Sequence, residues 1–348
     1  MAPPTEIIAG RLIKQAEWCE QLGSRFYAAL LQQAAADVRA RGVCFEVLRG
    51  HHHDPPDSAL ALRFLGAVHR LVLRGLAPQL AACYPSAGGD ASCEDLWPRF
   101  HAAIQQHTGS LAELVYCPVQ TNEVGRCAPL LGGFLEVIRC TGLPVRLFEV
   151  GAAGGLILRW DRYRYEHGKE GWGDPSSPVR ICGAFANAHP DFDVDVKIVD
   201  RRGCDASPID VVSEEGQLTL ESFLWPDQVE RRRQLLAAID VARRVPIHIE
   251  KANAANWVEA VLDDHAPGVA TVIYHSIVWQ YLSEGDRTRI KHLISAAGES
   301  ATPDDPLGWL RFEPGDNSAE VRLQLWPGGE DRLLARSGFH GRPVHWLG

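Results

Sequence analysis

Hydrophobic positions in the first part of the chain recur with the spacing of α-helices. One such pattern covers residues 26–38, and further helical segments are predicted at residues 60–76 and 96–104. Loops rich in Gly, Pro, Asp and Ser separate these segments, as at residues 50–58. No strand-like alternation interrupts them. We therefore expect residues 1–115 to form a helical N-terminal cap domain.

From residue 145 onward, short apolar runs alternate with helical segments, which is typical of a mostly parallel sheet covered by helices. The candidate strands are residues 145–150, 194–199 or their extension to 205, 245–250, 270–275 and 308–312. The candidate helices are residues 155–163, 220–242, 257–263 and 285–297. The pattern also predicts an inserted β-hairpin at residues 163–185, and a closing antiparallel hairpin that pairs residues 320–326 with 332–336. We expect residues 116–348 to form one Rossmann-like α/β domain.

Composition and charge narrow the class of protein without identifying it. The chain has 348 residues, of which 46% are hydrophobic and 23% charged, as in ordinary globular proteins. This length allows two domains, or one large domain with an appendage. The formal net charge of −9 disfavours a nucleic-acid partner, because phosphate backbones are bound by clustered positive charge.

Other features argue against secretion, a membrane span and a metal site. The N-terminus lacks a basic segment followed by an apolar core, and the most apolar helix, residues 62–76, carries His69, Arg70 and Arg74. The nine cysteines include no C-x-x-C pair, so we expect reduced thiols in a cytoplasmic protein. The three consecutive histidines that begin at His51 lie between Gly and Pro residues, and we expect a solvated loop there rather than a metal site.

The most informative motif follows the first predicted strand. Glu149 ends that strand, and a run of small residues at positions 151–155 leads into the next predicted helix. Such a turn brings backbone N–H groups close to a ligand and aims the positive end of a helix at it. The motif fits the dinucleotide fingerprint G-x-G-x-x-G poorly, because Ala153 replaces the second glycine and Leu156 the third.

The spacing of this motif resembles the first motif of class I methyltransferases, which use S-adenosylmethionine (SAM). In that interpretation Glu149 accepts hydrogen bonds from the amino group of the cofactor. The loop residues that would face its methionine or ribose portion are Gly151, Ala152, Ala153 and Gly155. The alternative is a generic strand-to-helix turn of any Rossmann-like protein.

A second acid is expected at the end of the second strand, where it would bind the ribose hydroxyls. Asp200 ends the apolar run that begins at Val196, and Asp205 stands in a G-x-D-x-S-P sequence of the kind found at that point in methyltransferases. Asp205 is favoured, although an Asp before Ser-Pro is also common in turns. Both acids lie further from the loop than the usual distance of about 20 residues, and the inserted hairpin must account for the excess.

Two asparagines and an arginine complete the candidate cofactor site. Asn253 follows the third strand and could bind the adenine ring, or it could cap the next helix. Asn122 and Arg126 precede an apolar helix that leads to the first strand, where they could bind the SAM carboxylate or the substrate. The alternative for this pair is a helix cap and a surface ion pair.

His275 is the candidate catalytic residue. It lies at the carboxyl end of the fourth strand, where ligands bind in open α/β sheets. An imidazole suits proton removal near neutral pH, so His275 is assigned as the general base for O- or N-methylation. The alternative is an imidazole that only positions the substrate.

Four motifs together resemble a large uncharacterised bacterial family, a domain of unknown function that is similar to SAM-dependent methyltransferases. They are Gln120-Thr121-Asn122-Glu123-Val124-Gly125-Arg126, Glu149-Val150-Gly151-Ala152, Gly203-x-Asp205-x-x-Pro208-Ile209-Asp210 and Tyr274-His275-Ser276. The resemblance covers nearly the whole chain and implies a class I methyltransferase sheet. The chain departs from the expected pattern at Ala252-Asn253-Ala254, where Gly-Asp-Ala would be usual, and slightly at Ala153-Gly154-Gly155.

The leading hypothesis is therefore a SAM-dependent methyltransferase that acts on an O or N nucleophile of a small molecule. A catalytically silent methyltransferase-like module, which binds SAM or a partner protein, is the alternative. A nucleotide-dependent oxidoreductase is disfavoured by the missing glycines and the closing hairpin. The sequence does not identify the methyl acceptor or the oligomeric state.

Overall fold

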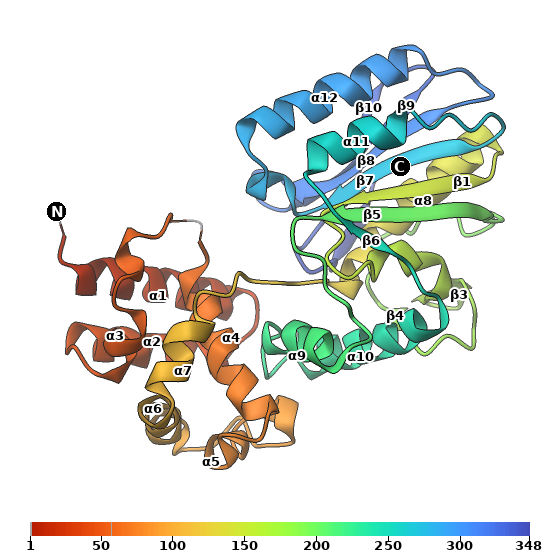
Figure 1. Cartoon of the computed structure of the whole chain (residues 1–348). Helices are drawn as coiled ribbons and strands as arrows, with labels where there is room; N and C mark the ends of the chain where they lie inside the picture. Colours follow the sequence, from red (N-terminus) through yellow and green to blue (C-terminus); the bar gives the residue numbers. More distant parts are fainter. Residues whose placement is uncertain (1, 57) are drawn as a thin grey trace. The chain divides into compact units, whose positions relative to one another are not determined.

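The computed structural model describes residues 2–56 and 58–348 and contains two compact units (Figure 1). The helical unit comprises Met1–Thr121 and Ser213–Arg233, and the sheet unit comprises Asn122–Val212 and Gln234–Gly348. The sequence placed the boundary near residue 115. The helical unit therefore takes in a second segment, Ser213–Arg233, that the sequence pattern assigned to the α/β domain.

The described residues of the helical unit form helices, as the periodic pattern predicts. They are α1 (Pro4–Gln21), α2 (Arg25–Arg39), α3 (Val43–Leu48), η1 (His51–His53), α4 (Leu60–Leu73), α5 (Pro78–Ala81), η2 (Pro85–Ala87), α6 (Leu96–Gln106), α7 (Thr108–Leu114), α9 (Glu214–Ser222) and the first residues of α10 (Val229–Arg244). The single helix predicted at residues 220–242 is wrong, because Pro226 cannot continue a helix and separates α9 from α10. Helix α4 is apolar on nearly all sides and is buried accordingly.

Two expectations for the helical unit need correction. Cys83 and Cys93 form a disulfide bond with Cα atoms 5.4 Å apart, whereas reduced thiols were expected throughout. The His51–His53 segment is a 3₁₀ turn rather than a solvated loop, because His51 is buried and its Nδ1 lies 2.9 Å from a carboxylate oxygen of Asp54. Among the described residues, no group of three or more His, Cys, Asp or Glu is arranged to hold a metal ion.

A buried histidine links three elements of the helical unit. His69 on α4 is 1% exposed, its Nδ1 lies 3.2 Å from the carbonyl oxygen of Ser222, and its Nε2 lies 2.7 Å from the hydroxyl of Ser86. A carbonyl oxygen only accepts, so Nδ1 carries the proton and the Ser86 hydroxyl donates to Nε2. Burial lowers the pKa of His69 from 6.5 to about 4, so the ring is neutral near pH 7.

The sheet unit carries the predicted α/β core. Its strands are β1 (Val145–Val150), β2 (Arg164–His167), β3 (Glu170–Trp172), β4 (Arg180–Cys182), β5 (Ile198–Asp205), β6 (Ile249–Lys251), β7 (Ala270–Ser276), β8 (Leu307–Pro314), β9 (Ala319–Trp326), β10 (Asp331–Ser337) and β11 (Val344–Trp346). Its helices are η3 (Val124–Arg126), α8 (Cys127–Thr141), η4 (Ile157–Arg162), the rest of α10, α11 (Ala254–Leu262), η5 (Trp279–Tyr281) and α12 (Glu284–Glu299).

The main sheet confirms the predicted fold class. Its strand order is β11-β10-β9-β8-β7-β1-β5-β6; β6, β5, β1, β7 and β8 are parallel, and β9 to β11 continue the sheet in antiparallel fashion. The five parallel strands therefore follow the order 3-2-1-4-5 of a Rossmann-like sheet. The inserted segment forms a small separate sheet, in which β2 pairs with β3 as the predicted hairpin and β4 adds a third strand parallel to β2.

Helices cover both faces of the main sheet (Figure 1). On one face, Phe134 of α8 packs edge-to-face on Tyr274 of β7; on the other face, Trp257 of α11 packs edge-to-face on Phe148 of β1. Every residue of β1 and of β7 is buried. This double coverage explains why the two central strands have continuous apolar runs rather than alternating patterns.

The helix expected after the glycine-containing turn is wrong. Residues 157–162 form the short 3₁₀ helix η4, and Arg159 within it has non-helical backbone angles (φ −105°, ψ 17°). No long helix with an aligned dipole therefore begins at residue 155. The ligand-binding argument from a helix N-terminus does not apply to this turn.

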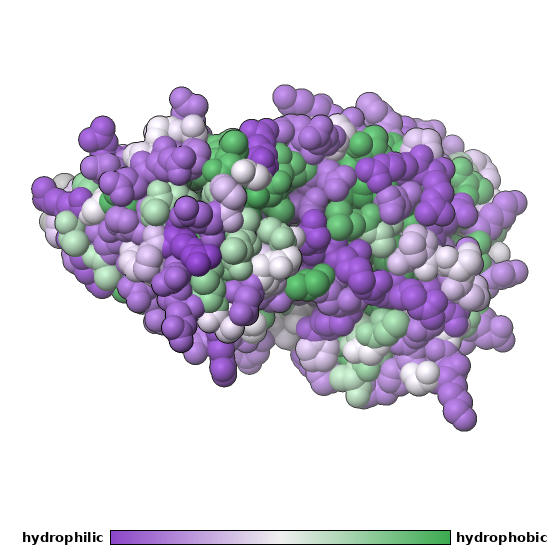
Figure 2. Space-filling view, turned by 90° about the horizontal axis from the view of Figure 1, so that it is seen from below, coloured by the Kyte–Doolittle hydropathy of each residue, from purple (hydrophilic) through white to green (hydrophobic). Residues whose placement is uncertain are grey.

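None of the described helices combines the length and the apolar character that crossing a bilayer requires. The face drawn in Figure 2 carries hydrophobic areas interspersed among hydrophilic side chains.

We predict that His69 makes the helical unit sensitive to acid. The unfolded chain binds a proton on this residue near pH 6.5, whereas the folded chain binds it only near pH 4, so stability falls as the pH drops through this window. The expected loss between pH 7 and pH 4 is about 3 kcal/mol, at 1.36 kcal/mol per pKa unit. Urea unfolding of the full chain as a function of pH measures it.

The variant His69→Gln should remove this part of the pH dependence, although it is less stable at pH 7. His53→Gln, a change at an exposed histidine of the same unit, is the matched control and should keep the dependence of the unmodified chain. An unchanged pH slope in His69→Gln would rule out this source of acid sensitivity.

Candidate functional site

The candidate site lies at the carboxyl edge of the parallel strands. Strands β1 and β7 are neighbours at the centre of the sheet. The strands that follow β1 in the chain, β5 and β6, lie on one side of this pair, and the strands that follow β7, beginning with β8, lie on the other. In open α/β sheets ligands bind at such a switch point, outside the carboxyl ends of the strands. The glycine loop (residues 151–155) leaves β1 at this point.

The glycine loop is tightly fitted against the rest of the sheet unit. Gly151 and Gly155 have positive φ angles of 72° and 68°, and a Cβ atom at Gly155 would lie 2.8 Å from Ile249. A Cβ atom at Gly151 would collide with Val278. Ala153 adopts φ 49°, a conformation that costs free energy for any residue with a side chain. The small residues are therefore required by close approach to the protein's own side chains as well as by turn geometry.

Asp205 holds the glycine loop to the end of β5. One carboxylate oxygen accepts a hydrogen bond from the amide of Ala153 at 2.9 Å, and the other accepts one from the amide of Ser207 at 2.8 Å. Asp205 is half-buried, and a carboxylate has further acceptor positions. Asp200, the other predicted acid, is exposed, pairs in register with Arg146 and forms an ion pair with Arg202. The structure places Asp205 beside the loop and Asp200 five residues earlier in β5, away from the carboxyl edge.

Glu149 is buried beneath the carboxyl edge and is not presented to solvent. It is 1% exposed, and the hydroxyl of Tyr274, its register partner on β7, donates a hydrogen bond to it at 3.1 Å. Burial raises the pKa of Glu149 well above its ordinary value, against the opposing effects of the Tyr274 hydrogen bond and the positive charges of Arg159 and Arg126. A covered carboxyl group that is bonded to Tyr274 does not match the predicted contact with a cofactor amino group.

Two arginines hold backbone carbonyl groups around the loop. Arg159 is 2% exposed and donates to the carbonyl oxygens of Gly155 at 2.7 Å and Val245 at 2.8 Å. Sequence analysis missed this residue, whose only signal is a cation within an apolar run. Arg126, a predicted residue, donates to the carbonyl oxygen of Ser276 at 3.0 Å and so connects the start of α8 to the end of β7.

The two predicted asparagines both make local backbone contacts. Asn122 accepts a hydrogen bond at 2.8 Å from the amide of Leu156, just after the glycine loop. Asn253 is the N-cap of α11, where its side-chain oxygen accepts from the amides of Ala255 and Asn256, and its Nδ2 donates to Asp286 at 3.1 Å. The capping alternative for Asn253 is therefore the arrangement seen.

His275 is held by a carboxylate that the sequence did not single out. It is 1% exposed, and its Nδ1 lies 2.6 Å from Oε1 of Glu313 on the neighbouring strand β8. The ring of Trp279 stacks on the imidazole at a centroid distance of 4.7 Å. The next residue but one, Ile277, has φ 51°, which is strained for a β-branched side chain. No spacing motif links His275 to Glu313; strand register alone brings them together.

A cavity of about 480 Å³ opens beside the glycine loop. Its lining includes Gly154, Arg159, Ile209, Asp210 and Ile249, all within the sheet unit. Its volume lies in the range of small-molecule sites. Its lining combines aliphatic side chains and the loop backbone with the charged side chains of Arg159, Asp210 and Arg243 and with His248.

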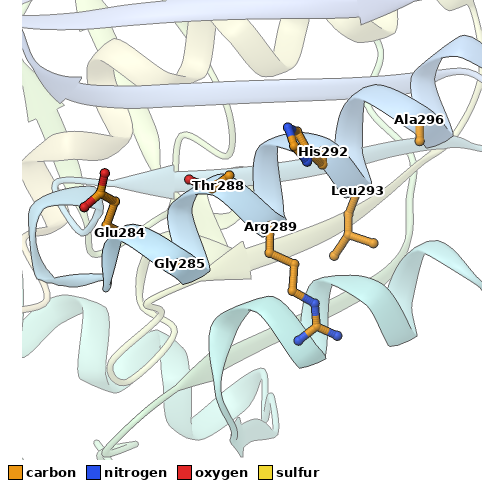
Figure 3. Close-up of a pocket in the computed structure, with 7 residues that line it drawn as sticks. All are labelled: Glu284, Gly285, Thr288, Arg289, His292, Leu293 and Ala296. Carbon is orange, nitrogen blue, oxygen red and sulfur yellow. The ribbon is translucent and has the colours of Figure 1, made fainter.

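A larger groove of about 710 Å³ lies along α12, and Figure 3 shows that its labelled side chains all come from that one helix. Arg289 reaches across to α11, where it bonds to Asn256 and Glu259. This open groove lacks the convergence of several elements that the cavity beside the loop has.

The sheet order and the tight loop at its carboxyl edge define a Rossmann-like α/β protein, with a cavity beside the loop on the side of β6. The chain belongs to the family described as an uncharacterized protein conserved in bacteria (DUF2332), whose sequence model matches residues 9–346. Neither the curated proteins nor the solved structures compared with this chain gave a match.

Removing the Asp205 carboxylate should loosen the glycine loop. The variant Asp205→Ala leaves the amides of Ala153 and Ser207 without acceptors, and we expect a loss of about 2 kcal/mol in the free energy of unfolding. Asp200→Ala removes an exposed ion pair on the same strand and should cost less than about 1 kcal/mol. Urea denaturation of both variants measures the difference, and equal losses would show that Asp205 does not hold the loop.

Proposed function

We propose that this protein is a SAM-dependent methyltransferase that acts on an O or N nucleophile of a small molecule. The observation that supports this most directly is the glycine loop at the switch point of a 3-2-1-4-5 parallel sheet, with a small-molecule cavity beside it. The negative net charge favours a small acceptor over nucleic acid. Membership of the DUF2332 family is compatible with this function, but the description of the family names no activity.

Most of the residues around the cavity suit the adenosyl part of SAM. Ile209, Val211 and Ile249 offer an apolar surface to a purine ring, and Gly154 borders the same space. Asp205 does not line the cavity, but it holds the loop that borders it and retains acceptor positions for ribose hydroxyls beyond the two amides that it already binds. When bound, SAM would supply a methyl group activated by a sulfonium.

Glu149 does not suit SAM in the way that the sequence indicated. Its carboxyl group is covered and engaged by Tyr274, so we assign it to the packing of β1 against β7 rather than to the cofactor. Asn122 and Arg126 are the other residues predicted to meet the charged amino acid portion of SAM. Both are also committed to backbone partners.

Glu149, Asn122 and Arg126 already have partners within the protein. This favours one second candidate function, a catalytically silent module with the same fold. A module of this kind needs the loop and the cavity for binding, but it has no use for a base. His275 supports the enzyme instead, because Glu313 orients its imidazole and its Nε2 has no hydrogen-bond partner among the described residues. Transfer of labelled methyl groups from SAM, tested with a panel of small acceptors, separates the two.

Calorimetric titration with S-adenosylhomocysteine tests the cofactor proposal, with NAD as the control ligand. We expect saturable binding of S-adenosylhomocysteine and none of NAD. Ile209→Trp fills the cavity and should weaken binding at least about tenfold, a change of 1.4 kcal/mol. Val199→Trp is the matched control, because Val199 is exposed and does not line the cavity.

The absence of S-adenosylhomocysteine binding to folded protein would overturn the proposal. Binding that Ile209→Trp leaves unchanged would remove the cofactor from this cavity. Binding without methyl transfer to any acceptor would favour the silent module.

A further inference from the structure

The two ring nitrogens of His275 have different environments. Nδ1 lies 2.6 Å from Oε1 of Glu313, and that carboxylate also accepts hydrogen bonds from the backbone amides of Val278 at 3.1 Å and Trp279 at 3.3 Å. A carboxylate that receives N–H groups acts only as an acceptor, so the proton of the neutral imidazole belongs on Nδ1. Nε2 is then a bare acceptor.

A donor on the neighbouring strand β8 also lacks a partner. Nε2 of His275 and Nε1 of Trp309 are both buried, and neither has a hydrogen-bond partner among the described residues. Ile273 pairs in register with Trp309, and side chains alternate along a strand, so His275 and Trp309 point to the same face of the sheet. Their ring centroids are 6.1 Å apart.

Two buried groups on neighbouring strands, an acceptor and a donor, thus lack partners among the described residues, and one group that both donates and accepts could serve them together. Burying either nitrogen without a partner costs about 1 to 3 kcal/mol. A hydroxyl can accept from the indole N–H and donate to the imidazole. An aliphatic amine is protonated near pH 7 and then cannot accept, and a thiol is a weak donor and acceptor.

We propose that Glu313 is a positioning residue that fixes His275 as a base through Nε2, and that the methyl acceptor is a hydroxyl group bound between His275 and Trp309. This inference rests on the proposed methyltransferase function and names its acceptor class. Glu313 acts only through His275 and does not itself touch the acceptor.

The acceptor hydroxyl, His275 and Glu313 each have a role in the proposed methyl transfer. The acceptor oxygen forms a bond to the methyl carbon as the bond between that carbon and sulfur breaks, and the electron pair of the broken bond stays on sulfur as a thioether. The hydroxyl proton moves to Nε2, and the imidazolium that results is stabilised by the negative charge of Glu313. The proton then leaves to water when the product departs. No oxidant or reductant is needed.

The first test reads the tautomer and is independent of SAM. The protein is labelled with ¹⁵N-histidine, and the signals of His275 among the 14 histidines are identified by their absence in His275→Gln. We expect the proton on Nδ1 in the unmodified chain and a mixture of tautomers in Glu313→Ala. Glu320→Ala is the matched control, because Glu320 pairs in register with Glu313 on β9 but bonds to Arg322. A proton on Nε2 in the unmodified chain would overturn the proposal even if Glu313→Ala fails to fold.

The second test identifies the acceptor class with benzyl alcohol, benzylamine and benzyl mercaptan as probes. Benzyl alcohol at millimolar concentration should shift both the Nε2 signal of His275 and the indole N–H signal of Trp309, and the His275 shift should be weaker in Trp309→Phe. An equal response to benzylamine or benzyl mercaptan, or no response to benzyl alcohol, would refute the hydroxyl assignment. If a tightly held water bridged the two nitrogens permanently, the hydroxyl probe would give no response.

The third test separates a positioning role from a structural one. With a hydroxyl acceptor and labelled SAM, Glu313→Gln should lower kcat while KM and the affinity for S-adenosylhomocysteine stay unchanged; His275→Ala should lower kcat by about 100-fold or more. A Glu313→Gln variant that changes KM alone would make Glu313 a structural residue. Failure of S-adenosylhomocysteine to bind the unmodified chain would instead overturn the methyltransferase proposal, and the tautomer result would stand by itself.

Discussion

The bond between Asp205 and the amide of Ala153 is the interaction on which the arrangement of the site depends. It ties the turn after β1 to the end of β5 and holds Ala153 at a positive φ angle that an alanine does not adopt by itself. In a long helix the next amides and carbonyls would bond to one another. Because η4 is short and irregular, the backbone groups around the loop need other partners. Side chains supply them: Asn122 at the amide of Leu156, Tyr163 at its carbonyl and Arg159 at the carbonyl of Gly155.

Side chains, rather than the hydrogen bonds of a helix, satisfy the backbone groups around the loop. This explains why several polar residues are buried there. Arg159 is buried, and desolvation lowers its pKa, yet its guanidinium bonds to carbonyl oxygens of the loop and of the segment before β6. Glu149 lies nearby, and its burial raises its pKa. The hydrogen bond from the Tyr274 hydroxyl gives this buried carboxyl group a partner. The charged groups that the sequence assigned to ligands are thus largely used to build the loop.

The sequence predicted the architecture better than the site. The strands at residues 145–150 and 270–275 were found because both are buried on two sides and read as continuous apolar runs. The prediction of a helix after the glycine loop was wrong, because apolar residues at helical spacing do not distinguish an α-helix from the short 3₁₀ helix η4. Asp205 could be identified by its turn sequence, whereas its bonds to two amides depend on three-dimensional proximity. No sequence motif identifies Glu313, because its contact with His275 arises only from the pairing of β7 with β8.

Strand alternation places a geometric limit on any chemistry at this edge. Tyr274 and His275 are consecutive in β7, so their side chains lie on opposite faces: Tyr274 meets Glu149 and Phe134 on the face of α8, while His275 lies near Trp309 on the other. The glycine loop packs toward the first face through its contacts with Arg159, and toward the second through the contact of Gly151 with Val278. Val278 also donates its amide to Glu313. A ligand that uses both the loop and His275 must therefore lie beyond the strand ends, where the strained residues Ala153 and Ile277 turn the chain.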